Sequence, residues 1–224
     1  MRLFIYCAGG LGREIYDICN RFNLIKSSYK EINFIDDSLS ARGSFFVNGI
    51  RAYNKNSSRF KKILGTNDEF LIANGEPEIR KKIYLSLSSD NKKFATVICP
   101  SSIISSSAKL SRGVIISPQC SIQNQSRIGK NVFLNTQSVI GHDAKIGAHS
   151  VISSKVNIGG NVKIGLSSYI GMGSQIKEGV QIGSNVIIGM GSVVYNNIPD
   201  NMIALGNPAR PMKRNLNKKV FKKV

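Results

Sequence analysis

Residues 140–175 read IGHDAK IGAHSV ISSKVN IGGNVK IGLSSY IGMGSQ, a run of hexads that each begin with isoleucine. The pattern continues in both directions without an insertion, so every sixth residue from Ile104 to Val194 is Ile, Leu or Val. The residue four places after each aliphatic is small or β-branched, as at Ala144, Ser150 and Val156. A period of six fits neither a helix nor a simple strand, and it is the sequence signature of a parallel β-helix.

The repeat also predicts the geometry of this β-helix. The aliphatic of each hexad points to the axis, and the small residue four places later points inward near a corner. Three hexads make one triangular coil of about 18 residues, and the repeat supplies about five coils stacked roughly 4.8 Å apart. Glycine often follows the aliphatic, as at Gly141 and Gly159, where we expect corners with unusual dihedrals. A sandwich of short strands would instead vary its loop lengths.

The first hundred residues follow a different pattern, in which apolar strands alternate with amphipathic helices. The expected strands are 3–7, 32–37, 70–75 and 93–99, and the expected helices are 13–22 and 76–87. Such alternation indicates a parallel sheet. The predicted organisation is a small Rossmann-like α/β domain at residues 1–97, a β-helix with a C-terminal cap at 98–212, and a basic tail at 213–224.

Composition narrows the possible partners. The chain has 224 residues, 42% of them apolar, and a net charge of +18. This apolar content supports a packed core. The charge favours polyanions, namely nucleic acid, anionic lipid or phosphorylated small molecules, and no nucleic-acid-binding motif accompanies it. A solvated, Lys-rich surface is the alternative to a phosphate-binding role for the tail. No apolar run reaches the roughly 20 residues of a membrane span, and the N-terminus does not read as a signal peptide, so we expect a cytoplasmic protein.

The cysteines and histidines argue against a metal centre. The four cysteines lie far apart, and we expect them to be buried, reduced thiols rather than disulfides or zinc ligands. They are Cys7, Cys19, Cys99 and Cys120. Two histidines are too few for the three-histidine site of a β-helix carbonic anhydrase. No metal is therefore expected.

The order of these features resembles a known family. The hexads resemble the hexapeptide acyltransferases, whose left-handed β-helices assemble as trimers. Three further motifs are Tyr6-Cys-Ala-Gly-Gly-Leu-Gly-Arg-Glu, Ile72-Ala-Asn-Gly-Glu-Pro-Glu-Ile-Arg, and the closing Gly206-Asn-Pro-Ala-Arg. Together they resemble the sugar O- and N-acetyltransferases of bacterial glycan synthesis, which include UDP-4-amino-sugar N-acetyltransferases of the bacillosamine pathway and sialic-acid O-acetyltransferases. The resemblance covers about residues 2–212 and implies a left-handed β-helix, acetyl-CoA as co-substrate and a homotrimer.

His142 is the candidate catalytic residue. It is third in its hexad, so its side chain should point outward, and an imidazole suits proton removal from an amine or hydroxyl near neutral pH. The resemblance implies that His142 is the general base and Asp143 its acidic partner. His149 is fourth in its hexad and lies on another side of the triangle. We expect it to be solvated or at a subunit contact, with a secondary role near acetyl-CoA as the alternative.

Acetyl-CoA is expected to bind along the β-helix. Residues 18 apart should stack on neighbouring coils, which places Gly160 beside His142. The missing side chain would leave room for the pantetheine arm, and the N–H would donate to the thioester oxygen; a glycine needed only for its dihedrals is the alternative. Met172 and Met190 are expected to extend the same groove. The resemblance places the Gly206 segment and the basic tail near the adenine and phosphates.

The glycine cluster of the α/β domain is the candidate acceptor site. Its spacing is not that of a GxGxxG dinucleotide fingerprint, but a strand, a glycine loop and a helix N-terminus can bind a diphosphate or a sugar. Carboxylates at the end of the second strand can bind ribose hydroxyls. The residues expected to line this cleft are Gly9, Gly10, Leu11, Asp36, Asp37 and Gly75. The family has a histidine where this chain has Leu11, which leaves the sugar undetermined.

These features predict an acetyl-CoA-dependent sugar acetyltransferase that uses direct attack rather than an acyl-enzyme. N-acetylation of a UDP-linked 4-amino sugar for surface glycan is the first interpretation. O-acetylation of a sialic-acid-like or other sugar is the alternative, since it needs the same base. A non-catalytic β-helix scaffold is the alternative from another class, which the His142–Asp143 pair disfavours.

Overall fold

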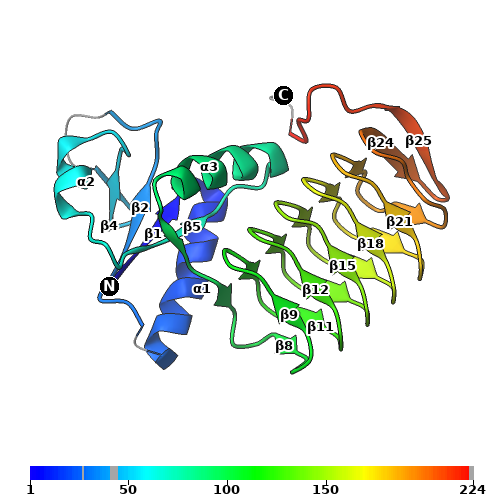
Figure 1. Cartoon of the computed structure of the whole chain (residues 1–224), viewed down its shortest axis with the longest axis horizontal. Coiled ribbons are helices and arrows are strands. Elements are labelled where there is room, and N and C mark those ends of the chain that lie inside the picture. The colour runs from blue at the N-terminus through cyan, green and yellow to red at the C-terminus, as the bar shows by residue number, and fades with distance from the viewer. Residues whose placement is uncertain (27, 41–44, 222–224) are drawn as a thin grey trace.

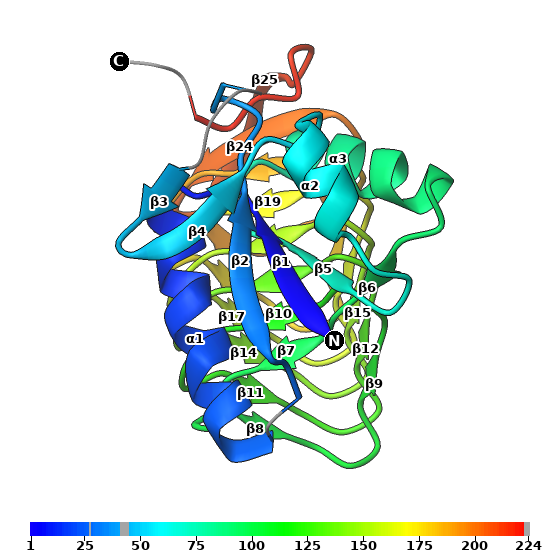
Figure 2. The same cartoon turned by 90° about the vertical axis from the view of Figure 1, so that its left-hand side faces the viewer.

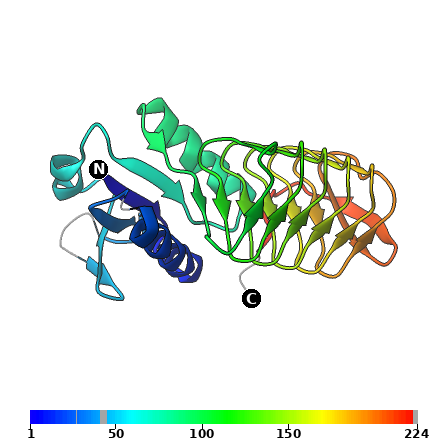
Figure 3. The same cartoon turned by 90° about the horizontal axis from the view of Figure 1, so that it is seen from below.

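The computed structural model describes residues 1–26, 28–40 and 45–221, with the backbone alone at 23–26. Figure 1 shows an α/β domain at the N-terminal end and a long stack of two-residue strands after it. Seen from below, the coils of the stack follow one another as parallel loops (Figure 3). The predicted succession of an α/β domain and a left-handed parallel β-helix is confirmed.

The α/β domain is built on a six-stranded sheet with the order β3-β4-β2-β1-β5-β6. Neighbouring strands are parallel, except that β3 runs antiparallel to β4. The strands are β1 (Arg2–Tyr6), β2 (Glu31–Ile35), β3 (Phe45–Val47), β4 (Ile50–Tyr53), β5 (Glu69–Ile72) and β6 (Lys93–Phe94). The helices are α1 (Gly10–Lys26), α2 (Ser58–Ile63) and α3 (Pro77–Ser89).

Helices cover both faces of this sheet (Figure 2). Leu3 and Ile5 of β1 pack with α1, and Phe4 between them packs on the opposite side with Phe60 of α2 and Tyr84 of α3. Leu3, Phe4 and Ile5 are fully buried, as expected for a central strand of a parallel sheet with helices on both faces.

Two parts of the α/β prediction need correction. The expected strand at 93–99 is wrong: β6 ends at Phe94, and β7 (Val97–Ile98) already pairs with the β-helix. The β3–β4 hairpin and α2 were not predicted. The hairpin turns at Asn48 and Gly49, whose φ angles are 50° and 77°. Asn-Gly is the usual sequence of such a turn, so the signal for the hairpin was present in the sequence.

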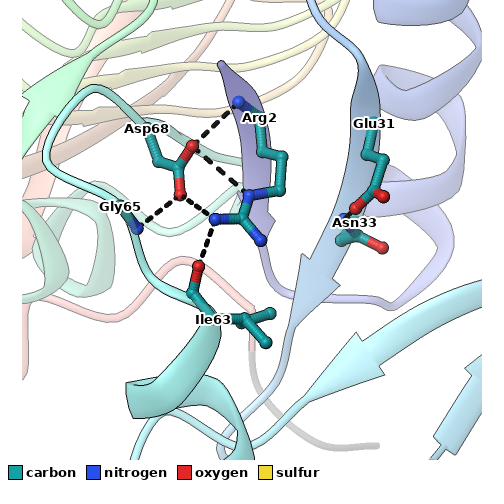
Figure 4. A network of polar contacts seen from close by, with 6 residues as sticks. All are labelled: Arg2, Glu31, Asn33, Ile63, Gly65 and Asp68. Atoms are coloured by element: carbon teal, nitrogen blue, oxygen red, sulfur yellow. Dashed lines mark hydrogen bonds and ion pairs between the residues drawn. The ribbon is translucent and has the colours of Figure 1, made fainter.

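An ion pair ties β1 to the loop before β5 (Figure 4). The Arg2 guanidinium lies 3.1 Å from Asp68, and the backbone N–H groups of Arg2 and Gly65 donate to the same carboxylate at 2.9 and 2.8 Å. The guanidinium also donates to the carbonyl of Ile63 at the end of α2. Burial alone would raise the pKa of Asp68, but these hydrogen bonds and the charge of Arg2 hold that pKa below its usual value.

Three sheets form the sides of the β-helix, and their strands are parallel except that β25 runs antiparallel to β24. The first contains β7, β10 (Ile115–Ile116), β13 (Phe133–Leu134), β16 (Val151–Ile152), β19 (Tyr169–Ile170), β22 (Ile187–Ile188), β24 (Met202–Gly206) and β25 (Ala209–Arg214). The second contains β8 (Ile103–Ile104), β11 (Ser121–Ile122), β14 (Val139–Ile140), β17 (Asn157–Ile158), β20 (Gln175–Ile176) and β23 (Val193–Val194). The third contains β9 (Lys109–Leu110), β12 (Arg127–Ile128), β15 (Lys145–Ile146), β18 (Lys163–Ile164) and β21 (Gln181–Ile182).

The register confirms the predicted coil. Ile140 pairs with Ile158 and Ile158 with Ile176, each 18 residues further along the chain. The hexad aliphatics and the small residues four places later share one core, in which Ala144 and Val156 have no exposed surface. Inward-facing residues of both kinds therefore fill the axis, as the repeat predicts.

The glycines after the aliphatics have a different role from the one predicted. Gly141 and Gly159 do not adopt positive φ; the left-handed residue comes two places later, as at Asp143 (φ 58°) and Asn161 (φ 59°). A Cβ atom on Gly141 would lie 2.5 Å from the backbone of the next coil. The expectation of glycine for its dihedrals is wrong, because close stacking of the coils requires these glycines instead.

The first side of the β-helix packs against the α/β domain (Figure 2). Its outward residues are apolar, and Ile115, Phe133 and Val151 belong to the same core cluster as α1. Arg80 of α3 is fully buried there and donates to the carbonyl and side-chain oxygens of Asn131 at 2.9 and 2.8 Å. This side is therefore an interdomain contact.

The cysteines are free, as predicted; Cys19, Cys99 and Cys120 are buried and Cys7 is half-buried. In the described ranges, no helix combines the length and apolarity that a membrane crossing needs. Within those same residues no cluster of three or more His, Cys, Asp or Glu side chains is arranged to hold a metal ion.

Candidate active site

His142 and Asp143 lie in the turn that follows β14 on the second side of the β-helix. His142 Nδ1 is 2.9 Å from Asp143 Oδ2, and the two side chains are 46% and 50% exposed. The predicted outward orientation of His142 is confirmed. With Nδ1–H donating to the carboxylate, the lone pair of the imidazole is on Nε2. Nε2 is therefore the atom that can accept a proton.

Gly160 lies directly beside this imidazole on the next coil. The N–H of Asn161 donates to the carbonyl of His142 at 2.8 Å, which confirms the predicted stacking. A Cβ atom on Gly160 would lie 2.6 Å from His142 Cε1 and closer still to Nε2. Gly160 has no positive φ, so a requirement for unusual dihedrals does not explain it. The missing side chain makes room for the His142 ring.

A basic groove runs beside Asp143 along the third side of the β-helix. Its volume is about 400 Å³. The lining residues are Gln125, Arg127, Asp143, Lys145, Asn161, Lys163, Gly179 and Gln181. Arg127, Lys145 and Lys163 come from adjacent strands in register. Like charges directly opposite each other on a sheet lower its stability, and an anion bound between them would offset this repulsion. The stacked charges of the groove therefore suit an anionic ligand.

Met172 and Met190 do not extend the His142 groove within one chain. Both are exposed, at 48% and 74%, but they follow β19 and β22 on the first side, whereas His142 follows β14 on the second. Two outward positions lie on the same edge of the prism only when a multiple of three hexads separates them. Neither methionine is separated from His142 in this way, so the expectation of one continuous groove is wrong. Their part in acetyl-CoA binding remains a prediction.

The glycines of the α/β domain divide into two kinds. Around Gly9 and Gly10, at the start of α1, nothing lies within 4 Å of an added Cβ. A Cβ on Gly12 would collide with the Cys7 carbonyl. Gly12 therefore allows α1 to lie close to the end of β1. The open space at Gly9 and Gly10 is compatible with a ligand at the helix N-terminus.

The two aspartates after β2 differ in their contacts. Asp36 accepts hydrogen bonds from the N–H groups of Ala8 and Ser38 at 2.9 and 3.0 Å. Burial opposes the effect, but these bonds hold the pKa of Asp36 below its usual value. Asp36 therefore fixes the glycine loop. Asp37 is exposed and accepts from the Tyr6 hydroxyl, so it is the more available of the two to a ligand.

The tail lies at the α/β domain in this structure. The N–H groups of Val220 and Phe221 donate to Glu76 at 2.8 and 2.7 Å, and the Phe221 ring lies beside Gly75. Lys222 and Lys223 fall outside the described residues. The tail is therefore held at the α/β domain of its own chain, and its contact with acetyl-CoA remains a prediction.

His149 is partly buried against the α/β domain rather than solvated. Its Nδ1 lies 3.1 Å from the amide nitrogen of Asn131, and its ring contacts Tyr84 edge to face at 5.1 Å. Burial, followed by the charges of Arg80, Lys81 and Lys130, lowers the pKa of His149 to about 4. The expectation of a solvated residue is therefore wrong, and His149 stays neutral in the pH range where His142 would act.

Three features of the site were missed in the sequence. The basic ladder of Arg127, Lys145 and Lys163 was visible, because the residues recur every 18 positions. The sequence predicts Glu76 only as the start of a helix, and the contact between Phe221 and Gly75 has no local signal. Contacts between segments so far apart in sequence produce no periodic pattern from which they could be predicted.

Two family models match the chain. The PglD N-terminal domain matches residues 2–87, and the bacterial transferase hexapeptide (six repeats) matches residues 125–160 and 161–196. The fold, the matches and the exposed histidine of the turn define a hexapeptide-repeat acyltransferase. More particularly, the combination of a PglD N-terminal domain with hexapeptide repeats is similar to that of the PglD-type sugar acetyltransferases. The resemblance seen in the sequence is confirmed.

Several solved structures are similar over nearly the whole chain. The acetyltransferase domain of PglB from Neisseria gonorrhoeae, in complex with acetyl coenzyme A, is 29% identical with a TM-score of 0.84, covering 94% of this chain and 98% of that one. WeeI from Acinetobacter baumannii is 26% identical with a TM-score of 0.84, covering 95% and 100%. PerB from Caulobacter crescentus, in complex with CoA and GDP-perosamine, is 23% identical with a TM-score of 0.84, covering 95% and 98%, and shows the shared fold. A search of curated proteins finds no match.

Proposed function

We propose that the protein transfers the acetyl group of acetyl-CoA to the amine of a UDP-linked 4-amino sugar in surface glycan synthesis. The observation that carries this proposal is the His142–Asp143 pair, with Nδ1 2.9 Å from the carboxylate and Nε2 over Gly160. The PglB domain bound to acetyl coenzyme A and PerB bound to CoA and GDP-perosamine support both substrate classes. We place the reaction in the cytoplasm, where both substrates are made.

The reaction follows from the orientation of the imidazole. The acceptor nitrogen attacks the thioester carbon, and the carbonyl electrons move to the oxygen. His142 Nε2 takes the proton from the attacking nitrogen, and Asp143 stabilises the imidazolium that forms. Collapse of the intermediate breaks the C–S bond and releases the CoA thiolate, which takes the proton from the His142 imidazolium and restores the neutral base. The N–H of Gly160 is the candidate donor to the developing oxyanion.

Two surfaces of the chain would hold the substrates. The open space at Gly9 and Gly10 and the exposed Asp37 would take the nucleotide sugar, with the diphosphate at the N-terminus of α1. The basic groove at Lys145 and Lys163 would take phosphates of acetyl-CoA. The charge of the basic groove matches its proposed ligand.

We propose a homotrimer in which the site is completed between subunits. Met172 and Met190 lie at a different edge of the prism from His142, so only a second chain can bring that edge to the catalytic turn. Light scattering should give three chains per particle. A monomer with full activity would contradict this arrangement.

The deciding experiment is a substrate panel. UDP- and GDP-linked 4-amino sugars and free sialic acids are incubated with acetyl-CoA, thiol release is followed, and product masses are read. We expect a mass gain of one acetyl group on a UDP-linked amino sugar. Leu11 stands where the family has a histidine, which favours including hydroxyl acceptors, and a product formed only from these would make the enzyme an O-acetyltransferase. Absence of thiol release with every sugar would refute the proposed function.

A further inference from the structure

The C-terminal segment runs from the end of the β-helix back to the α/β domain. It leaves β25 after Arg214 and ends beside the start of α3 (Figure 1). Asn215 fixes its first part, because its N–H donates to the Asn201 carbonyl at 2.7 Å and its side chain donates to the Asn185 carbonyl at 2.8 Å. We refer to residues 215–221 as the strap.

Glu76 holds the other end of the strap. This carboxylate is 8% exposed, and each of its oxygens accepts a backbone N–H of the strap, from Val220 at 2.8 Å and from Phe221 at 2.7 Å. Glu76 stands at the N-cap of α3 without a capping hydrogen bond from its side chain. A buried carboxylate requires hydrogen-bond partners. The strap supplies them, so its attachment is built into the α/β domain.

The strap places an aromatic ring beside Gly75 and Leu11, two of the residues predicted to bind the acceptor. A Cβ on Gly75 would lie 3.2 Å from the Phe221 ring and 4.0 Å from Leu11. Tyr169 of the β-helix contacts the same ring edge to face, at 5.7 Å and 82°. These contacts come from the loop after β5, from α1 and from β19, so Phe221 lies where the α/β domain and the β-helix meet.

Phe221 is nevertheless 54% exposed. Half of a large apolar ring therefore faces open space beside the residues that we assign to the nucleotide sugar. Binding sites for small molecules are lined by aromatic rings, which add contact area at a low cost in conformational freedom. A pyranose presents C–H groups that can pack on such a ring.

We propose that Phe221 is a residue of the acceptor site and forms the wall against which the sugar packs, with Glu76 as its positioning residue. This inference rests on the proposed function, because it takes the ligand of the cleft to be a nucleotide-linked sugar. It assigns the C-terminal strap to acceptor binding rather than to acetyl-CoA.

Fluorescence tests the location directly. The chain has no tryptophan, so Phe221→Trp introduces a single tryptophan at the proposed wall, whose emission can be excited apart from that of the tyrosines. Titration with the UDP-amino sugar should change its emission, whereas titration with acetyl-CoA alone should not. Leu216→Trp is the matched control, since Leu216 is in the same strap and is 79% exposed. A response to acetyl-CoA alone, or equal responses of the two variants to the sugar, would overturn the inference.

Kinetics test the role. Phe221→Ala should raise the KM for the nucleotide sugar about tenfold, the scale of one lost aromatic contact, and leave the KM for acetyl-CoA within about twofold. Glu76→Gln should raise the same KM by less, because an amide oxygen still accepts one of the two N–H groups. Leu216→Ala is the control. The inference is overturned if Phe221→Ala has an unchanged KM for the sugar, a raised KM for acetyl-CoA or a changed oligomeric state. If the wild-type enzyme acetylates no sugar, the proposed function is overturned and the inference with it.

Discussion

The imidazole of His142 lies over the bare Cα of Gly160, one coil further along the β-helix. A Cβ at position 160 would come within 2.6 Å of the ring carbon Cε1, so the glycine and the histidine fit only together. The same stacking directs Nε2 towards the backbone of the next coil.

Gly160→Ala should therefore displace the ring without unfolding the protein. The contact is with a half-exposed side chain, which can rotate away at little cost. We expect kcat to fall about 10- to 100-fold, as when a catalytic group is misplaced by an ångström or so, with an unchanged melting temperature. Leu166→Ala is the control, because Leu166 is also third in its hexad, is 53% exposed and lies on a different edge of the prism. Equal kcat values for the two variants would show that the fit is not needed for catalysis.

His142→Ala should lower kcat by about 10² to 10⁴, the usual contribution of a general base. Its stability should not change, because the side chain points away from the core. Asp143→Asn should cost less, since the carboxylate orients the ring and does not take the proton.

The pH profile separates the two histidines. An acidic limb in the wild-type profile of kcat against pH should be lost in His142→Ala. His149 cannot supply it, because burial lowers the pKa of His149 to about 4. A His149→Ala variant that loses the limb while His142→Ala retains it would reverse the assignment.

Lys163→Met should have opposite effects on binding and stability. Lys145 and Lys163 stand opposite each other on adjacent strands, so removing one charge relieves repulsion and should raise the melting temperature slightly. The KM for acetyl-CoA should rise roughly three- to tenfold, the scale of one charge contact, with a weaker dependence on salt. Lys61→Met on α2 is the control. Loss of stability without a change in KM would assign the ladder a structural role.

Arg80→Met should destabilise the protein by about 3 kcal/mol, because it leaves buried carbonyls without a donor. The guanidinium donates hydrogen bonds to the carbonyl of Asn131 in the β-helix and to the carbonyl of Ile72 in the sheet. Burial lowers the pKa of Arg80 to about 9, so it remains charged at neutral pH. Urea unfolding measures the effect, with the exposed Lys82→Met as control. Similar midpoints for both variants would mean that the domains do not depend on this contact.

Acid should remove the stability that Asp68 contributes. The folded-state pKa of Asp68 lies below its unfolded value, so its contribution is complete above the unfolded value and is lost as the pH falls through the folded one. Asp68→Asn should lower the free energy of unfolding by about 1–2 kcal/mol at pH 7. Below about pH 5, the free energy of unfolding of this variant should depend less on pH than that of the wild type. The exposed Asp90→Asn should change neither quantity; a matching loss in that variant would point to net charge instead.

The sequence by itself determined the β-helix, its 18-residue coil and the contact between His142 and Gly160. Each hexad position faces inward or outward by the same rule, so a local period encodes both the core and the stacking. The α/β strands at 3–7, 32–37 and 70–75 were also readable, because buried parallel strands are continuous apolar runs.

Only the tertiary structure decided which outward positions are covered and by what. It divided the expected strand at 93–99 between two sheets, buried His149 against Tyr84, and separated Met172 from His142. It also carried Phe221 back to Gly75. These contacts join segments that are far apart in sequence and share no period. Their free energy depends on how the surfaces of the α/β domain and the β-helix fit together, and no pattern within either one encodes that fit.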